Sequence, residues 1–286
     1  MLTSSPECWD HTVPSRDGLP LKVRCWFTPR ARGMVVVAHG LGDHAGAYAH
    51  LAEAIGRPLG VDFLAPDFRG HGRSPGRRGV VRRYEDLVED LNAIVAWARS
   101  RHPELPLFVL GHSNGGQVVL RMALRPPPGL AGVIASNPAI QIAMPVPPAK
   151  LKLGKLLLSL APWLTLRSNA PCTWMTRDPA MQQKYRADGL RHNRVSAPLY
   201  FGMVEGGEML LARAGEITTP ILMIIGGQDP VIDPATSREF FDRLASPDKT
   251  LLLYPKMLHE PFNELGREQV FDDLARWLDA RLVVIG

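Results

Sequence analysis

Short apolar runs alternate along the chain with longer segments in which apolar residues recur at helical spacing. This alternation is typical of βαβ units that build a parallel sheet. Because the apolar runs are continuous rather than strictly alternating, we expect strands that helices cover on both faces. The expected strands are residues 34–38, 62–65, 107–110, 130–135, 221–225 and 250–254, and the expected helices are residues 48–55, 84–99, 117–124, 235–244 and 268–282.

Two segments depart from this alternation. Residues 11–28 predict an antiparallel hairpin that turns at Arg16-Asp17-Gly18. Residues 138–195 carry no strand pattern, and within them residues 150–166 are apolar with three lysines. We therefore expect one α/β core, residues 1–137 and 196–286, and an inserted helical cap at 138–195. The apolar stretch fits a lid that lies on a lipid interface, and it fits equally a cap helix packed on its own domain.

Composition narrows the class of protein. The chain has 286 residues, 45% of them hydrophobic and 21% charged, which excludes a disordered chain. No stretch is long and apolar enough for a multi-span membrane protein. Three scattered cysteines exclude a disulfide framework and a cysteine-based zinc site. The first residues have neither a basic start nor an apolar stretch, so we expect a cytoplasmic protein that touches membranes only peripherally.

The positive charge has one dense cluster. The net charge is +5, and no acidic residue lies between Asp67 and Glu85. A solvated loop is the simplest interpretation, and a surface for anions or lipid headgroups is the alternative. No nucleic-acid-binding motif accompanies the cluster, so we expect no nucleic-acid partner. Its arginines are Arg69, Arg73, Arg77, Arg78, Arg82 and Arg83.

A nucleophile motif follows the third expected strand. Residues 111–116 read Gly-His-Ser-Asn-Gly-Gly, a G-x-S-x-G pattern between a strand and a helix. A serine on such a sharp turn projects its hydroxyl beyond the sheet edge, and the helix that begins there favours negative charge. The sequence therefore predicts that Ser113 is a catalytic nucleophile.

A serine nucleophile needs a base and an acid that orients the base. Where this motif occurs, the acid and then the histidine follow the serine along the chain. Among nine histidines, His259 alone follows the last core strand on a loop before the final helix. Asp229 lies on the loop after the preceding strand and is the expected acid. Asp233, which precedes Pro234, reads instead as a helix N-cap.

An oxyanion hole needs two backbone N–H donors. Asn114 follows the nucleophile and supplies the first. Leu41 lies in the loop His39-Gly-Leu-Gly after the first parallel strand and supplies the second. His39 and His44 have no acidic or cysteine partners in their cluster, so we expect loop-packing histidines, no metal site and no cofactor.

Taken together, these motifs resemble the monoacylglycerol lipase and lysophospholipase group of α/β-hydrolases. The resemblance rests on residues 39–48, 67–74, 111–116, 227–231 and 258–264 and extends over nearly the whole chain. It implies the α/β-hydrolase fold, with an eight-stranded, mostly parallel sheet flanked by helices and a flexible apolar cap. It also implies hydrolysis of fatty acyl esters.

Several positions depart from the group. Asn114 stands where the group usually has Met, and Asp43 stands for Glu. Ala47 replaces an Arg, and Phe262 replaces a second His, which weakens the case for recognition of glycerol in particular. Ester hydrolysis is untouched, because it needs only the backbone N–H of Asn114.

The sequence thus predicts a serine ester hydrolase that acts on a small acyl ester through an acyl-enzyme on Ser113. Alternatives are a broad-specificity esterase, thioesterase or lactonase of the same fold, and a non-catalytic binding protein. The expected substrate pocket includes Asp43, Leu199, Met203 and Phe262. The cap is expected to contact lipid surfaces.

Overall fold

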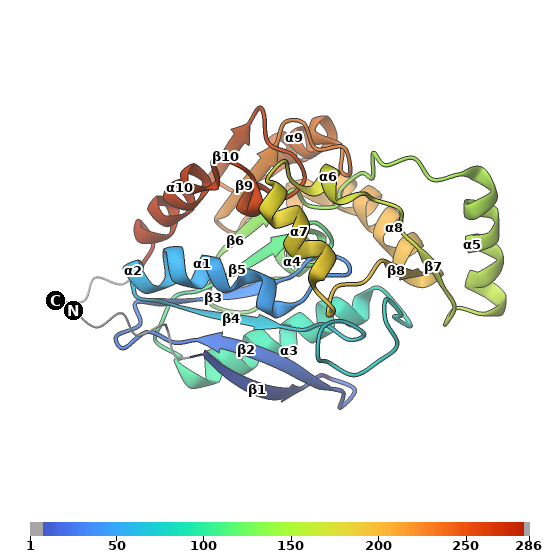
Figure 1. Cartoon of the computed structure of the whole chain (residues 1–286). Helices are drawn as coiled ribbons and strands as arrows, with labels where there is room; N and C mark the ends of the chain where they lie inside the picture. Colours follow the sequence, from blue (N-terminus) through green and yellow to red (C-terminus); the bar gives the residue numbers. More distant parts are fainter. Residues whose placement is uncertain (1–7, 283–286) are drawn as a thin grey trace.

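The computed structural model describes residues 8–282, and an eight-stranded sheet forms its centre (Figure 1). The strand β2 pairs antiparallel with both of its neighbours, and all the other pairs are parallel. The expected eight-stranded, mostly parallel sheet is therefore confirmed, as is the N-terminal hairpin. The spatial order is β1 (Cys8–Pro14), β2 (Pro20–Trp26), β4 (Val61–Pro66), β3 (Gly33–Ala38), β5 (Leu107–His112), β6 (Leu130–Ser136), β9 (Ile221–Gly226) and β10 (Lys249–Tyr254).

Helices cover both faces of the sheet, as the continuous apolar strands predicted. Side chains alternate along each strand, so Val36 faces one helical layer and Val35 the other. The layer on the Val36 side consists of α3 (Glu85–Arg101), α4 (Asn114–Ala123), α8 (Ala197–Arg213) and α9 (Pro234–Arg243). The opposite layer consists of α10 (Arg267–Asp279) and the segment between β3 and β4.

The expected helix at residues 48–55 is not one regular helix. It is divided into the 3₁₀ turn η1 (Ala45–Tyr48), α1 (Ala49–Leu51), the π-helical turn η2 (Ala52–Gly56) and α2 (Arg57–Leu59). Pro58 has no N–H to donate to the carbonyl of Ala54, so a regular α-helical ladder cannot continue there.

The segment between β6 and α8 lies over one end of the sheet (Figure 1). It contains α5 (Pro148–Leu160), β7 (Thr165–Arg167), α6 (Cys172–Met175), α7 (Pro179–Ala187) and β8 (Arg194–Ser196). The expectation of no strands here was wrong, because β7 and β8 form an antiparallel pair. Each has only three residues, too few for a periodic pattern. Among residues 8–282, no helix is long and apolar enough to cross a membrane.

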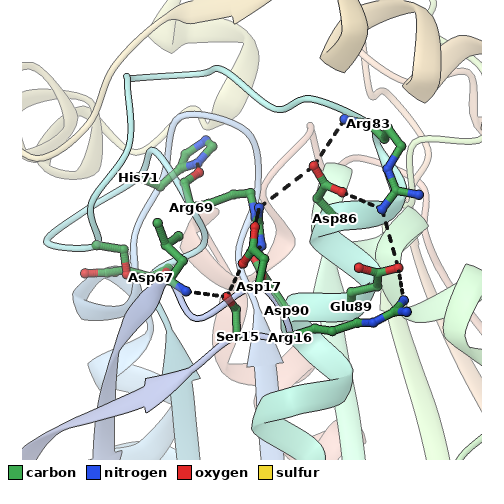
Figure 2. Close-up of polar contacts among 12 residues, drawn as sticks. Ser15, Arg16, Asp17, Asp67, Arg69, His71, Arg83, Asp86, Glu89 and Asp90 are labelled. Atoms are coloured by element: carbon green, nitrogen blue, oxygen red, sulfur yellow. Dashed lines mark hydrogen bonds and ion pairs between the residues drawn. The ribbon is translucent and has the colours of Figure 1, made fainter.

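Arg69, Arg73 and Arg83 of the arginine cluster form ion pairs with acidic side chains, and Figure 2 shows the surroundings of Arg69 and Arg83. The Nε of Arg69 donates to Asp90 at 2.7 Å and its Nη1 to Asp17 at 2.9 Å, with the guanidinium only 11% exposed. Arg83 pairs with Asp86 at 3.0 Å. Neither a solvated loop nor an anion-binding surface describes Arg69, whose charge links the β1–β2 turn to α3. Local sequence could not reveal this, because the acids lie outside the loop.

Candidate active site

Ser113 occupies a strained turn between β5 and α4. Its φ is +54°, a left-handed conformation that costs free energy for a non-glycine residue. The flanking glycines make the turn possible. A Cβ on Gly111 would lie 2.2 Å from the carbonyl oxygen of Gly115, and one on Gly115 would lie 2.0 Å from that of Ala38.

Ser113, His259 and Asp229 form one hydrogen-bonded chain. His259 Nε2 lies 3.0 Å from Ser113 Oγ, and His259 Nδ1 lies 2.7 Å from Asp229 Oδ2. Both His259 and Asp229 are buried. Burial acts to lower the pKa of His259, but Asp229 outweighs it, and the pKa is raised above its ordinary value of 6.5. The geometry suits proton transfer from the serine to the histidine.

Asp229 is held by the loop that follows β9. Its Oδ1 accepts from the backbone N–H of Val231 at 2.8 Å and of Ile232 at 3.1 Å, which leaves Oδ2 for His259. Asp233 caps α9 by accepting from Ala235 and Thr236, so its expected structural role is confirmed.

Asn137 also orients the site, and sequence reasoning missed it. Its Nδ2 donates to the carbonyl oxygen of His259 at 2.7 Å, and its Oδ1 accepts from the N–H of Gly226 at 2.8 Å. Asn137 therefore ties the histidine loop to the end of β9. It lies directly after β6, with φ +37°, and a single Asn after a strand gives no usable signal in one sequence.

The two expected oxyanion donors lie beside the nucleophile. Asn114 begins α4, so its N–H belongs to the first turn and has no acceptor within the helix. Its side chain is engaged elsewhere, since Oδ1 accepts from Tyr84 at 2.8 Å. Leu41 lines the same cavity as Ser113. His39 supports this loop, because Nε2 accepts from the N–H of Phe68 and Nδ1 donates to the carbonyl of Gly40.

His112, which precedes Ser113, packs its ring against the catalytic histidine. Its ring centroid lies 5.0 Å from that of His259. Burial lowers the pKa of His112 to about 4, so a neutral ring packs against the catalytic base.

An apolar cavity of about 180 Å³ reaches Ser113 and His259. Met203 lines it, as expected. Asp43, Leu199 and Phe262 do not, which corrects three of the four expected pocket residues. Leu199 and Phe262 are packed in the two hydrophobic layers, and Asp43 faces a buried arginine. The segment between β6 and α8 supplies much of the lining, including Met144, Val146, Leu151, Gly154, Leu157 and Leu166.

No group of three or more potential metal-ligating side chains occurs within residues 8–282. His39 and His44 are instead engaged in hydrogen bonds within and between loops. The described site thus offers general acid–base and nucleophilic groups.

Known proteins are similar to this chain over most of its length. Residues 29–266 match the Hydrolase_4 family, described as serine aminopeptidase, S33. The chain belongs to this family of α/β-hydrolases. The hydrolase is 36% identical over 276 residues to a monoacylglycerol lipase of Mycolicibacterium smegmatis, which covers 96% of this chain and 98% of that one.

Solved structures give the same result. A monoacylglycerol lipase of Paleococcus ferrophilus matches with a TM-score of 0.81 and 29% identity over 96% of this chain and 99% of that one. A soluble variant of the Saccharomyces cerevisiae monoglyceride lipase, in complex with a substrate analogue, matches with a TM-score of 0.86 and 25% identity over 99% and 97%. The hydrolase is therefore an enzyme similar to the monoacylglycerol lipases, as the motifs indicated.

Proposed function

We propose that this hydrolase cleaves acyl esters through an acyl-enzyme on Ser113, with monoacylglycerols as the favoured substrate class. The observation that carries the proposal is the chain Ser113–His259–Asp229 beside an apolar cavity. Each methylene of an acyl chain buried in such a cavity contributes about 0.8 kcal/mol, so fatty acyl groups should bind well. The similarity to monoacylglycerol lipases supports the same substrate class.

The mechanism follows from the hydrogen bonds. Ser113 Oγ attacks the acyl carbon while His259 Nε2 takes the hydroxyl proton, and the N–H groups of Leu41 and Asn114 stabilise the oxyanion. His259 then gives the proton to the leaving alcohol oxygen, and the C–O bond breaks. Water then attacks the acyl-enzyme while His259 takes its proton. His259 returns this proton to Ser113 Oγ as the acyl–Oγ bond breaks and the carboxylic acid leaves.

A broad-specificity esterase is the second candidate, with thioesters or lactones as further substrates. This candidate is favoured because Ala47 and Phe262 offer no polar group that could bind glycerol. Ala47 packs on the hydrophobic layer beside α10, and Phe262 is 2% exposed and outside the cavity lining.

We further propose that the inserted cap, residues 138–195, is a lid that contacts lipid surfaces through α5. One side of α5 lines the cavity with Leu151 and Leu157. Its other side exposes Leu156 (54%) and Leu160 (67%) beside exposed lysines. The helix stands at the outer edge of the molecule (Figure 1).

The nucleophile and the substrate class are tested together. A fluorophosphonate probe should label the wild-type protein and not Ser113→Ala, and the variant should lose about 10⁴-fold or more in kcat. A substrate panel should include monoacylglycerols, lysophospholipids, p-nitrophenyl esters of increasing chain length, a thioester, a lactone and an aminoacyl p-nitroanilide. Absence of labelling of the folded protein contradicts the enzyme mechanism. Preference for short esters over every lipid favours the broad-specificity esterase.

A further inference from the structure

The second half of the cap is fastened to the loops that carry the catalytic groups. The N–H of His192 donates to the carbonyl of Gly42 at 2.9 Å, and a Cβ on Gly42 would lie 1.9 Å from the carbonyl oxygen of His192. His44 Nε2 donates to Asp188 at 2.7 Å. Residues 188–192 therefore lie directly on the loop that contains Leu41.

The same part of the cap also contacts the histidine loop. The N–H of Glu260, the residue after His259, donates to the carbonyl of Met175 at 2.9 Å. Two loops of the core that are far apart in sequence thus meet one segment of the cap.

A buried cluster of three charges lies where these elements meet. Arg191 Nη2 lies 3.0 Å from Asp43 Oδ1, and Arg191 Nη1 lies 3.6 Å from Glu260 Oε1. The three side chains are only 17%, 8% and 7% exposed. The guanidinium carbon lies 3.9 Å from the ring centroid of Tyr185, a cation–π contact that holds it in place.

The contact between Arg191 and Asp43 is electrostatic. Among the described residues, neither Arg191 Nη2 nor Asp43 Oδ1 has a hydrogen-bond partner, so charge attraction rather than alignment joins them. Glu260 is supported further, because its Oε2 accepts from Tyr185 and Asn263. Loss of the arginine would therefore leave Asp43 more exposed to repulsion than Glu260.

Both carboxylates lie next to catalytic groups in the chain. Asp43 is two residues after the oxyanion donor Leu41, and Glu260 follows the general base His259. Burial opposes the charge of Glu260, but Arg191 and other neighbours lower its pKa to about 2. Burial raises the pKa of Asp43 against the attraction of Arg191. One cationic side chain from the cap thus faces two acidic side chains of the core.

We propose that Arg191 is a positioning residue of this hydrolase, which holds the oxyanion loop and moderates the field at His259 by pairing with Asp43 and Glu260 and offsetting part of their negative charge. The proposal rests on the proposed roles of Leu41 and His259. Without Arg191, two buried carboxylates repel each other, oppose the oxyanion and favour the imidazolium form of His259. Other titratable or polar groups that face the cluster are His44, Tyr48, His112, Tyr185, Asp188 and Asn263.

The test compares Arg191→Met, Arg191→Lys and the double variant Arg191→Met/Asp43→Asn. Arg186→Met is the matched control, because Arg186 is exposed on α7 and, among the described residues, its side chain forms a hydrogen bond only with Gln182. The substrate is soluble p-nitrophenyl butyrate, which does not require a lipid surface. Measured are kcat, KM, the pH profile of kcat/KM and the melting temperature.

We expect Arg191→Met to lower kcat by about tenfold or more with a smaller change in KM. As the solution is acidified, the kcat/KM of this variant should begin to fall at a higher pH than that of the wild type, because the loss of Arg191 raises the pKa of His259. Its melting temperature should drop by about 5 °C or more. Arg191→Lys should shift the acid limb in the same direction but less. The double variant should regain part of the kcat, the pH profile and the melting temperature.

Two results overturn the proposal. One is an Arg191→Met variant with the wild-type pH profile. The other is a double variant no better than Arg191→Met, which would mean that Arg191 acts through packing. If Arg191→Met does not fold, the double variant decides, because a double variant that also fails to fold would mean that Arg191 acts through packing and would overturn the proposal. If the wild type neither reacts with fluorophosphonate nor hydrolyses the ester, the proposed function fails, and the melting temperatures alone decide whether the charges are balanced as described.

Discussion

His259 is placed so that each of its ring nitrogens has one task. Nδ1 donates to Asp229 Oδ2, which fixes the tautomer that leaves Nε2 to accept from Ser113. The other oxygen of Asp229 is engaged by two backbone N–H groups, so the carboxylate cannot rotate away. The catalytic chain is therefore preorganised by the loop after β9 as much as by the three side chains.

This arrangement predicts the pH dependence of activity. The base must be neutral to accept the serine proton, and the pKa of His259 is raised above 6.5. We expect kcat/KM for a soluble ester to be high above that pKa and to fall as pH decreases through it. Asp229→Asn should lower kcat by about 10⁴-fold, because the wrong tautomer is then favoured. A wild-type profile that stays flat down to pH 5 would contradict the assignment of His259 as the base.

At the scale of the element, α5 differs from the rest of the cap. Residues 172–196 are joined to the core by hydrogen bonds and buried charges, whereas α5 packs mainly on α8. An amphipathic helix normally exposes polar residues, but α5 has leucines on both its cavity side and its solvent side. This composition is expected of a helix whose outer side lies in water in the free protein and in the lipid interface when the protein binds a membrane.

Charged substitutions on the outer side of α5 test that role. Leu156→Glu/Leu160→Glu should reduce co-sedimentation with anionic phospholipid vesicles and lower activity on dispersed monoacylglycerol by about tenfold. Activity on p-nitrophenyl butyrate should change little, since neither residue lines the cavity. The matched control is Leu265→Glu, an exposed leucine (56%) outside the cap. Equal vesicle binding by the α5 variant and the wild type would remove the proposed lipid contact.

At the scale of the whole molecule, buried histidines connect the loops that surround the site. Burial lowers the pKa of each of several histidines, so the folded protein holds them neutral. The unfolded chain would bind protons below pH 6.5, where the folded chain does not. These histidines therefore contribute stability above pH 6.5 that is lost as the pH falls toward 4. They are His39, His50, His112 and His192, with pKa values of about 4.

We expect the free energy of unfolding to fall steeply between pH 6.5 and pH 5. Each of these histidines should contribute about 1.4 kcal/mol per pH unit to the slope. Urea denaturation at several pH values measures it. His50→Gln should remove the contribution of one histidine, about 1.4 kcal/mol per pH unit, from the slope. The glutamine amide still offers a donor for the carbonyl of Phe262. A free energy of unfolding that is independent of pH in this range would contradict the prediction.

Sequence reasoning located the sheet because its signal is local. Each apolar run lies within a single strand, and the central strands β3, β5 and β9 are buried on both faces. It missed α8, whose glycines look unfavourable for a helix. Gly207 is needed there because a Cβ would lie 1.8 Å from the carbonyl oxygen of Ile140. A propensity that is weak in isolation is thus overridden by close packing of α8 against the core.

The sequence by itself determined the order along the chain of the eight strands of the large sheet and the candidates Ser113, Asp229 and His259. It could do so because backbone geometry ties a nucleophile turn, an acid loop and a histidine loop to the ends of successive strands. Only the tertiary structure decided which side chains meet across loops: Asn137 with His259, Arg69 with Asp17 and Arg191 with Asp43. These contacts join residues far apart in the chain, and they depend on burial and charge balance that no local pattern records.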